Sequence, residues 1–151
     1  MKCFAALILF LFPGAGSLLC GQSPLTGTLE IRFTGIRSDR GQIAVGMNRS
    51  PEGWPREPHM DFFWEKDGLD NGVLVAEIEN LPYGVYAISV LDDVNRNGEM
   101  EMVLGIPREG WGFSNNPANR LSPPDFNKCA FLIEQPFVRI TIELHYAAGG
   151  R

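Results

Sequence analysis

The segment Val138-Arg139-Ile140-Thr141-Ile142-Glu143-Leu144-His145-Tyr146 (138–146) carries the clearest secondary-structure pattern in the chain. Apolar and polar side chains alternate at every position, which is the period of a β-strand with one buried face. The same alternation occurs at 29–33, 43–47, 74–81 and 86–90, with turn-forming residues between these segments. These five segments predict β-strands.

Helical patterns are weak by comparison. No window keeps an apolar stripe at helical spacing for three turns, and the best candidate, 57–66, contains Pro58, which limits it to a turn or two. Short strands joined by short connections favour antiparallel pairing, because a parallel crossover needs a longer connection. We therefore expect an all-β protein, an antiparallel β-sandwich of about seven strands with one long loop rich in aromatic residues and proline.

The composition fits a folded domain with a core. The chain has 151 residues, 44% of them hydrophobic and 21% charged, which argues against intrinsic disorder. The formal net charge is −5. A nucleic-acid-binding protein normally presents a basic patch, so we expect no nucleic-acid partner.

The N-terminal residues resemble a secretory signal peptide. Lys2 gives a positive start, an apolar run covers 3–12, and small residues follow. We expect a signal peptide at 1–21, a single β-sandwich domain at 22–151, and a secreted or periplasmic protein without a transmembrane helix. The alternative is a lipoprotein anchored at Cys20, although Leu19 fits the lipidation pattern poorly.

The segment 92–101 is the main place where sequence suggests chemistry. Asp93, Asn95 and Asn97, followed by Gly98, match the first half of a calcium-binding loop, in which oxygen ligands at alternate positions converge on one ion. The predicted metal ligands are Asp93, Asn95, Asn97, Glu99 (through its carbonyl) and Glu101. Position 12 of the pattern is Leu104 rather than a bidentate glutamate. The alternative is a plain β-turn, which the same residues also favour.

The segment 104–126 predicts a long irregular loop, and loops of this length are often functional. One interpretation is a surface that binds a small molecule or a glycan, with aromatic faces beside polar side chains. The residues predicted to bind this ligand are Arg108, Trp111, Phe113, Asn115 and Asn116. The alternative is a loop that only packs its aromatic residues over one end of the sandwich.

Catalytic signatures are weak. Ser114 lies in Gly-Phe-Ser-Asn-Asn rather than in a nucleophile elbow, and Cys129 lies in an apolar run that predicts a small buried side chain. We expect a protein that is not an enzyme, with Ca²⁺ as its cofactor or none. Its expected partner is an envelope component or a small molecule; a hydrolase is the less favoured alternative.

Several segments together carry a resemblance to a known family. They are 35–45, 50–55, 81–90, 93–101, 104–116 and 123–126. The chain resembles, over roughly 28–146, a bacterial exported family labelled domain of unknown function 2141. The resemblance implies a secreted or envelope β-domain and assigns no activity. The turn Leu-Pro-Tyr-Gly (81–84) is also similar to transthyretin-like and carboxypeptidase-regulatory sandwiches, as an analogy of fold only.

Overall fold

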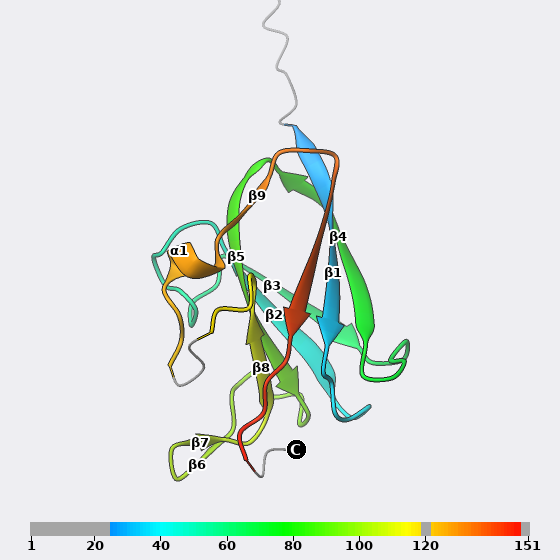
Figure 1. The fold of residues 1–151 in the computed structure, drawn as a ribbon, viewed down its shortest axis with the longest axis vertical. Helices are drawn as coiled ribbons and strands as arrows, with labels where there is room; N and C mark the ends of the chain where they lie inside the picture. The colour runs from blue at the N-terminus through cyan, green and yellow to red at the C-terminus, as the bar shows by residue number, and fades with distance from the viewer. Residues whose placement is uncertain (1–24, 119–121, 149–151) are drawn as a thin grey trace, which may run out of the picture.

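The computed structural model describes residues 25–118 and 122–148, so the predicted signal peptide (1–21), with Cys20, lies outside the described residues. The described residues form two packed sheets, a small hairpin and one short helix (Figure 1). Seven of the strands have four or more residues. The predicted all-β sandwich is therefore confirmed.

The smaller sheet has three strands in the order β10-β1-β4. They are β1 (Thr26–Thr34), β4 (Leu74–Pro82) and β10 (Phe137–Glu143). β1 pairs with β4 antiparallel and with β10 parallel. The expectation of antiparallel order is wrong for β1 and β10, because these strands come from opposite ends of the domain and no short loop joins them.

The larger sheet has five antiparallel strands, with the order β3-β2-β5-β8 and β9 pairing with the start of β5. They are β2 (Gln42–Asn48), β3 (Met60–Glu65), β5 (Gly84–Asp93), β8 (Gly110–Phe113) and β9 (Phe131–Ile133). The predicted helix turn at 57–66 is wrong, because β3 occupies most of this segment. Phe62 and Trp64 point from β3 toward the core, and the Trp64 ring lies 6.1 Å from the ring of Phe33.

The core fills the space between the two sheets. Leu29, Ile31 and Phe33 of β1 are fully buried, as their alternation predicts. The same holds for Ile43 and Met47 of β2. Burial of these apolar side chains is the main favourable contribution to folding, at about 25 cal/mol per Å² of apolar surface. The alternation of apolar and polar side chains therefore determines which face of each strand is exposed to solvent.

The outer face of the five-stranded sheet is partly covered. The helix α1 (Phe126–Cys129) packs over the middle of β5, where Phe126 and Cys129 form a small second core with Ala87. A hairpin of β6 (Met102–Val103) and β7 (Ile106–Pro107) lies near the other end of the same sheet (Figure 1). No helix among the described residues has the length and apolar character needed to span a membrane.

Candidate functional site: an aromatic groove and the loop beside it

Asp93 ends β5, and the acidic loop leaves the sheet at this residue. The Asp93 carboxylate is buried: its Oδ1 accepts a hydrogen bond from the backbone N–H of Asn97 (3.1 Å). Its Oδ2 accepts from the N–H of Gly98 (3.0 Å) and from Nε2 of Gln42 (2.8 Å). This carboxylate therefore closes the loop and ties it to β2.

The two asparagines of the motif act in the same way. Oδ1 of Asn95 accepts from the N–H of Asn97 (3.1 Å), and Oδ1 of Asn97 accepts from the N–H of Glu99 (2.8 Å). The side chains of Glu99 and Glu101 are exposed. The described part of the chain brings no three His, Cys, Asp or Glu side chains together to hold a metal ion. A calcium ion here would depend largely on amide and backbone oxygens, and it stays a prediction.

Glu109 holds the base of the segment between β5 and β8. Its side chain is almost fully buried, and its Oε1 accepts from the N–H of Val94 (3.0 Å) while its Oε2 accepts from the N–H of Glu101 (3.1 Å). The N–H of Arg108 also donates to the carbonyl of Glu101 (2.8 Å). One buried carboxylate thus joins the two ends of the acidic loop, a role that the sequence does not reveal.

The aromatic residues of the segment 104–126 belong to a strand. The prediction of a wholly irregular loop is wrong at 110–113, where β8 pairs with β5. Gly110 and Gly112 allow β8 to lie close to the C-terminal segment: a Cβ on Gly110 would lie 2.5 Å from the Tyr146 ring, and one on Gly112 would lie 2.8 Å from Ile142. Because successive side chains point to opposite faces, Trp111 and Phe113 project outward.

These two aromatic side chains line a groove on the outer face of the five-stranded sheet, with a volume of about 930 Å³. Small side chains contribute to its lining, with Ala44 and Gly46 on β2 and Ser89 on β5. The hairpin and the segment before β3 complete the lining with proline and methionine side chains. We call this feature the sheet groove.

Residues outside the predicted loop also contribute to the sheet groove. Phe63 on β3 lines it with a side chain that is 56% exposed. Arg56, Asp61 and Glu99 add charged groups. Phe63 was missed as a site residue because Phe62 and Trp64 beside it are also aromatic, which hides the alternation that would place Phe63 on the outer face.

The outer face of the three-stranded sheet has a different character. Glu30 on β1 forms an ion pair with Arg139 on β10, and this pairing lowers the pKa of Glu30 through its hydrogen bond to the guanidinium. Glu77 on β4 lies opposite Glu30. One outer face thus carries ion-paired charges beside the exposed Val75 and Phe137, whereas the other gathers aromatic and small side chains in one groove.

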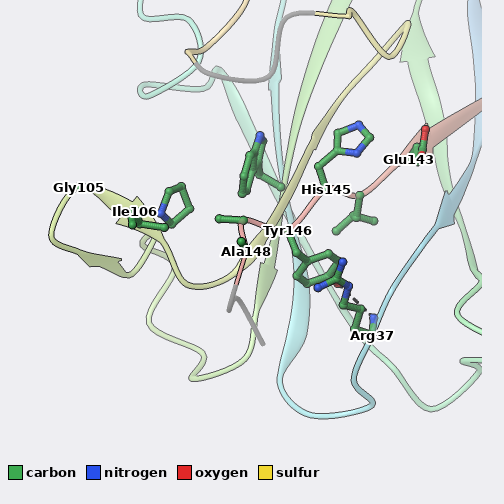
Figure 2. Close-up of a pocket in the computed structure, with 11 residues that line it drawn as sticks. Arg37, Gly105, Ile106, Glu143, His145, Tyr146 and Ala148 are labelled. Atoms are coloured by element: carbon green, nitrogen blue, oxygen red, sulfur yellow. Dashed lines mark hydrogen bonds between the residues drawn. The ribbon is translucent and has the colours of Figure 1, made fainter.

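A second hollow of about 650 Å³ lies beside the C-terminal segment (Figure 2). Arg37, Tyr146 and Trp111 line it, and Trp111 also lines the sheet groove. The backbone of Trp111 is fixed by a pair of hydrogen bonds with His145, at 2.9 and 2.8 Å. We call this feature the Arg37 hollow.

Three residues predicted to bind a ligand, Arg108, Asn115 and Asn116, lie outside both hollows. The amide of Asn115 donates to the carbonyl of Ala130 (2.8 Å). The amide of Asn116 bonds to the edge of β10, donating to the carbonyl of Thr141 (2.9 Å) and accepting from the N–H of Glu143 (2.8 Å). Both asparagines have positive φ, which this residue type tolerates. Neither they nor Arg108 lines the two hollows, so only Trp111 and Phe113 of the predicted set meet there.

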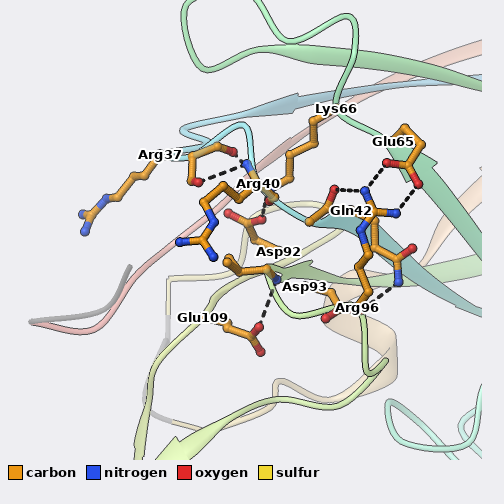
Figure 3. Close-up of polar contacts among 12 residues, drawn as sticks. Arg37, Arg40, Gln42, Glu65, Lys66, Asp92, Asp93, Arg96 and Glu109 are labelled. Atoms are coloured by element: carbon orange, nitrogen blue, oxygen red, sulfur yellow. Dashed lines mark hydrogen bonds and ion pairs between the residues drawn. The ribbon is translucent and has the colours of Figure 1, made fainter.

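A buried polar network lies beside the Arg37 hollow (Figure 3). Lys66 forms an ion pair with Asp92 and donates to the carbonyls of Ser38 (3.0 Å) and Arg40 (2.6 Å). The hydroxyl of Tyr146 donates to Oδ2 of Asp92 at 2.5 Å. Burial, followed by the contact with Asp92, raises the pKa of Tyr146. Every donor of Lys66 thus has an acceptor, which suits a structural network.

The two candidate nucleophiles, Ser114 and Cys129, are buried in the packed interior. The hydroxyl of Ser114 is buried, donates to the carbonyl of Cys129 (2.6 Å) and accepts from the N–H of Ile88 (2.9 Å). Cys129 is fully buried, as predicted, and burial raises the pKa of its thiol to about 11. A thiol with this pKa carries little thiolate near neutral pH.

The fold and the groove define the class of this molecule, an all-β sandwich with one aromatic outer face. The family described as an uncharacterized protein conserved in bacteria (DUF2141) matches residues 31–141, and the chain belongs to this family. The family resemblance seen in the sequence is therefore confirmed. Comparison with curated proteins and with solved structures gave no match.

Proposed function

We propose that this protein is an exported, non-catalytic binding module of the bacterial envelope, and that it binds a sugar chain in the sheet groove. The observation that carries the proposal is the contrast between the two outer faces. The face of the three-stranded sheet has ion-paired charges, as at Glu30 and Arg139. The sheet groove instead is lined by Phe63, which is 56% exposed, and by the half-buried Trp111 and Phe113, although apolar surface of this kind is normally buried.

Stacking is the physical basis of the proposed binding. A sugar ring has an apolar face that packs on an aromatic ring, and its hydroxyls hydrogen-bond to polar groups at the edge of the site. Arg56, Asp61 and Glu99 supply such groups in the sheet groove. The small side chains of Ala44 and Gly46 leave space above the sheet for a ring.

The non-catalytic part of the proposal is supported by what the candidate nucleophiles do. Cys129 is part of the second core and Ser114 donates to its carbonyl, and both side chains are buried and absent from the lining of the sheet groove. Asp93 is engaged by Asn97, Gly98 and Gln42. None of these groups is aimed at a substrate position in either hollow.

Export and calcium belong to the same proposal. Export is supported by the sequence of residues 1–21, and the mass of the purified protein tests it by identifying a cleaved N-terminus or a lipidated Cys20. Calcium at the Asp93 loop is supported by the D-x-N-x-N-G spacing, and it would stiffen the segment that leads to the groove wall.

The binding proposal is tested with two groove variants. Trp111→Ala and Phe63→Ala each remove one stacking surface, and isothermal calorimetry with a panel of cell-wall oligosaccharides measures the affinity. We expect each change to weaken binding by up to about tenfold, since an aromatic contact contributes about 0.5–1.5 kcal/mol. Phe137→Ala is the matched control, because Phe137 is an exposed aromatic on the other sheet. Binding that all three variants share with the parent, or no binding at all, would exclude the groove as the site.

A further inference from the structure

The Arg37 hollow and the sheet groove meet at Trp111 and the hairpin. Trp111 lines both, as do Gly105 and Pro107 of the hairpin. A ligand that stacks on Trp111 in the sheet groove can therefore extend into the Arg37 hollow without leaving the protein surface. The chemistry of this hollow then determines which group of the ligand it accepts.

The Arg37 guanidinium is the cation of this hollow; it is held by Tyr146 and has no ion pair among the described residues. The guanidinium carbon of Arg37 lies 4.3 Å from the centre of the Tyr146 ring, and the N–H of Arg37 donates to the Tyr146 hydroxyl (3.2 Å). That hydroxyl is itself fixed by Asp92. Arg37 is exposed and lines the hollow, and no ion pair of its side chain is found within residues 25–118 and 122–148. Stacking on a ring preorganises a guanidinium while its planar edge stays available for an oxyanion.

We propose that the Arg37 hollow is a subsite for a carboxylate, and that the sugar chain bound by this protein is acidic, with a uronic-acid type of residue next to Trp111. The inference rests on the proposed function, which supplies the stacking surface. The Arg37 guanidinium binds the carboxylate through charge-assisted hydrogen bonds. The acidic ring packs against the indole of Trp111 in the same event.

A sugar is favoured over an acidic peptide by the way the strands pair. Peptides often bind sheets by adding a strand to a free edge. β2 and β5 beneath the sheet groove each have hydrogen-bonded neighbours on both sides. The floor of the groove therefore offers a ligand side-chain surfaces, and this suits stacked rings, although β3 at its side is an edge strand.

The hollow also contains an acidic side chain, so attraction of a carboxylate would have to come from Arg37 itself. Glu143 lines the same hollow, together with His145. Preference for an acid therefore depends on Arg37 rather than on a general positive field, and the protein as a whole is acidic. Without Arg37 the hollow would lose the side chain that attracts a carboxylate.

The test uses two probes that differ only in charge. Hexagalacturonate carries carboxylates, and its methyl ester has the same rings without the charges. Calorimetry on the purified chain should show about tenfold or greater preference for the acid, and this preference should fall with added salt. Arg37→Gln should abolish the preference and leave binding of the ester within about twofold, whereas Arg37→Lys should keep part of the preference. Arg32→Gln, on the outer face of the three-stranded sheet, should change neither affinity.

Each other outcome counts against the inference. Equal binding of acid and ester by the parent overturns the acidic subsite, while loss of both on Trp111→Ala would still support the proposed function. A preference lost equally in Arg32→Gln shows a general charge effect and also overturns it. Tighter binding of a glutamate-rich hexapeptide than of the sugar overturns the choice of ligand. Binding of no probe at all means that both proposals fail.

Discussion

Lys66 and Asp92 form an ion pair in which both side chains are fully buried. Lys66 comes directly after β3, and Asp92 lies near the end of β5 on its inward face. Through Lys66 the pair fixes the carbonyls of Ser38 and Arg40, which belong to the turn between β1 and β2. Through Asp92 it fixes Tyr146. Four separate parts of the chain are therefore joined at one charged contact, next to the Arg37 hollow.

Removal of one member of this pair should be strongly destabilising. Lys66→Met leaves the Asp92 carboxylate buried without its counter-charge, and the cost of such a change is about 3–5 kcal/mol. Urea unfolding followed by circular dichroism measures the free energy of unfolding. Adding Asp92→Asn to Lys66→Met should recover part of the loss, because the uncompensated charge is then gone.

The matched control is an exposed pair on the same sheet. Arg96 contacts Glu65 with both side chains about half exposed, and Arg96 lowers the pKa of Glu65 mainly through its hydrogen bonds. Arg96→Gln should cost far less than Lys66→Met, because water screens an exposed pair. Equal losses for Lys66→Met and Arg96→Gln would mean that burial of the first pair has no special effect.

The strands could be predicted where one face is buried and the other is solvated. β1, β2, β4, β5 and β10 have alternating side chains, and the core residues Leu29, Ile31 and Phe33 follow directly. β3 and β8 were missed for a physical reason. In β3 the outward Phe63, between Asp61 and Glu65, interrupts the alternation of apolar and polar side chains. In β8 the outward positions are Trp111 and Phe113 and the inward positions are glycines, so the usual pattern of a strand is absent.

The site could be predicted only in part, because its residues come together through pairing of distant strands. Trp111 and Phe113 were found as aromatic residues of a long connecting segment, but Arg37 lies more than seventy residues before them in the chain. Arg37 and Trp111 line the same hollow because Tyr146 packs against Gly110 of β8 and stacks with Arg37 in the turn after β1. Asn115 and Asn116 were misassigned because an asparagine that bonds to backbone and one that binds a ligand look alike in sequence.

Glu109→Gln should loosen the hairpin wall of the sheet groove. A glutamine has one acceptor oxygen, and its amide group would face a backbone N–H that also donates, so the bond to Val94 or to Glu101 is lost. We expect a loss of about 1–3 kcal/mol in the free energy of unfolding. Amide hydrogen exchange at Val94 and Glu101 should become faster.

The control for this change is Glu99→Gln. The Glu99 side chain is exposed, so its replacement should leave both exchange rates and the stability nearly unchanged. If Glu109→Gln also leaves exchange at Val94 and Glu101 unchanged, the buried carboxylate does not hold the base of the loop.

Cys129 should stay unreactive in the folded protein. Burial raises the pKa of its thiol from 9.0 to about 11, so at about pH 8 almost no thiolate is present to react. Because the folded pKa lies above the unfolded value, the linked stability is present below about pH 9 and is lost as the pH rises toward about 11. Peptide mapping after iodoacetamide treatment should find the Cys129 peptide labelled only when denaturant is added. Labelling under native conditions at the same rate would contradict the buried, protonated state.

The calcium prediction can be separated from the structural role of the loop by comparing two neighbouring glutamates. In the predicted ligand set Glu101 contributes its side chain, whereas Glu99 contributes only its carbonyl; both side chains are exposed, so neither substitution should disturb the fold without metal. Calcium that binds the folded state should raise the melting temperature as its concentration passes Kd, with about 2.7 kcal/mol of stabilisation at one hundred times Kd. Glu101→Gln should reduce this shift, and Glu99→Gln should preserve it, in thermal melts with calcium and with a chelator. If millimolar calcium leaves the parent's melting temperature unchanged, Asp93, Asn95 and Asn97 serve only to close the turn.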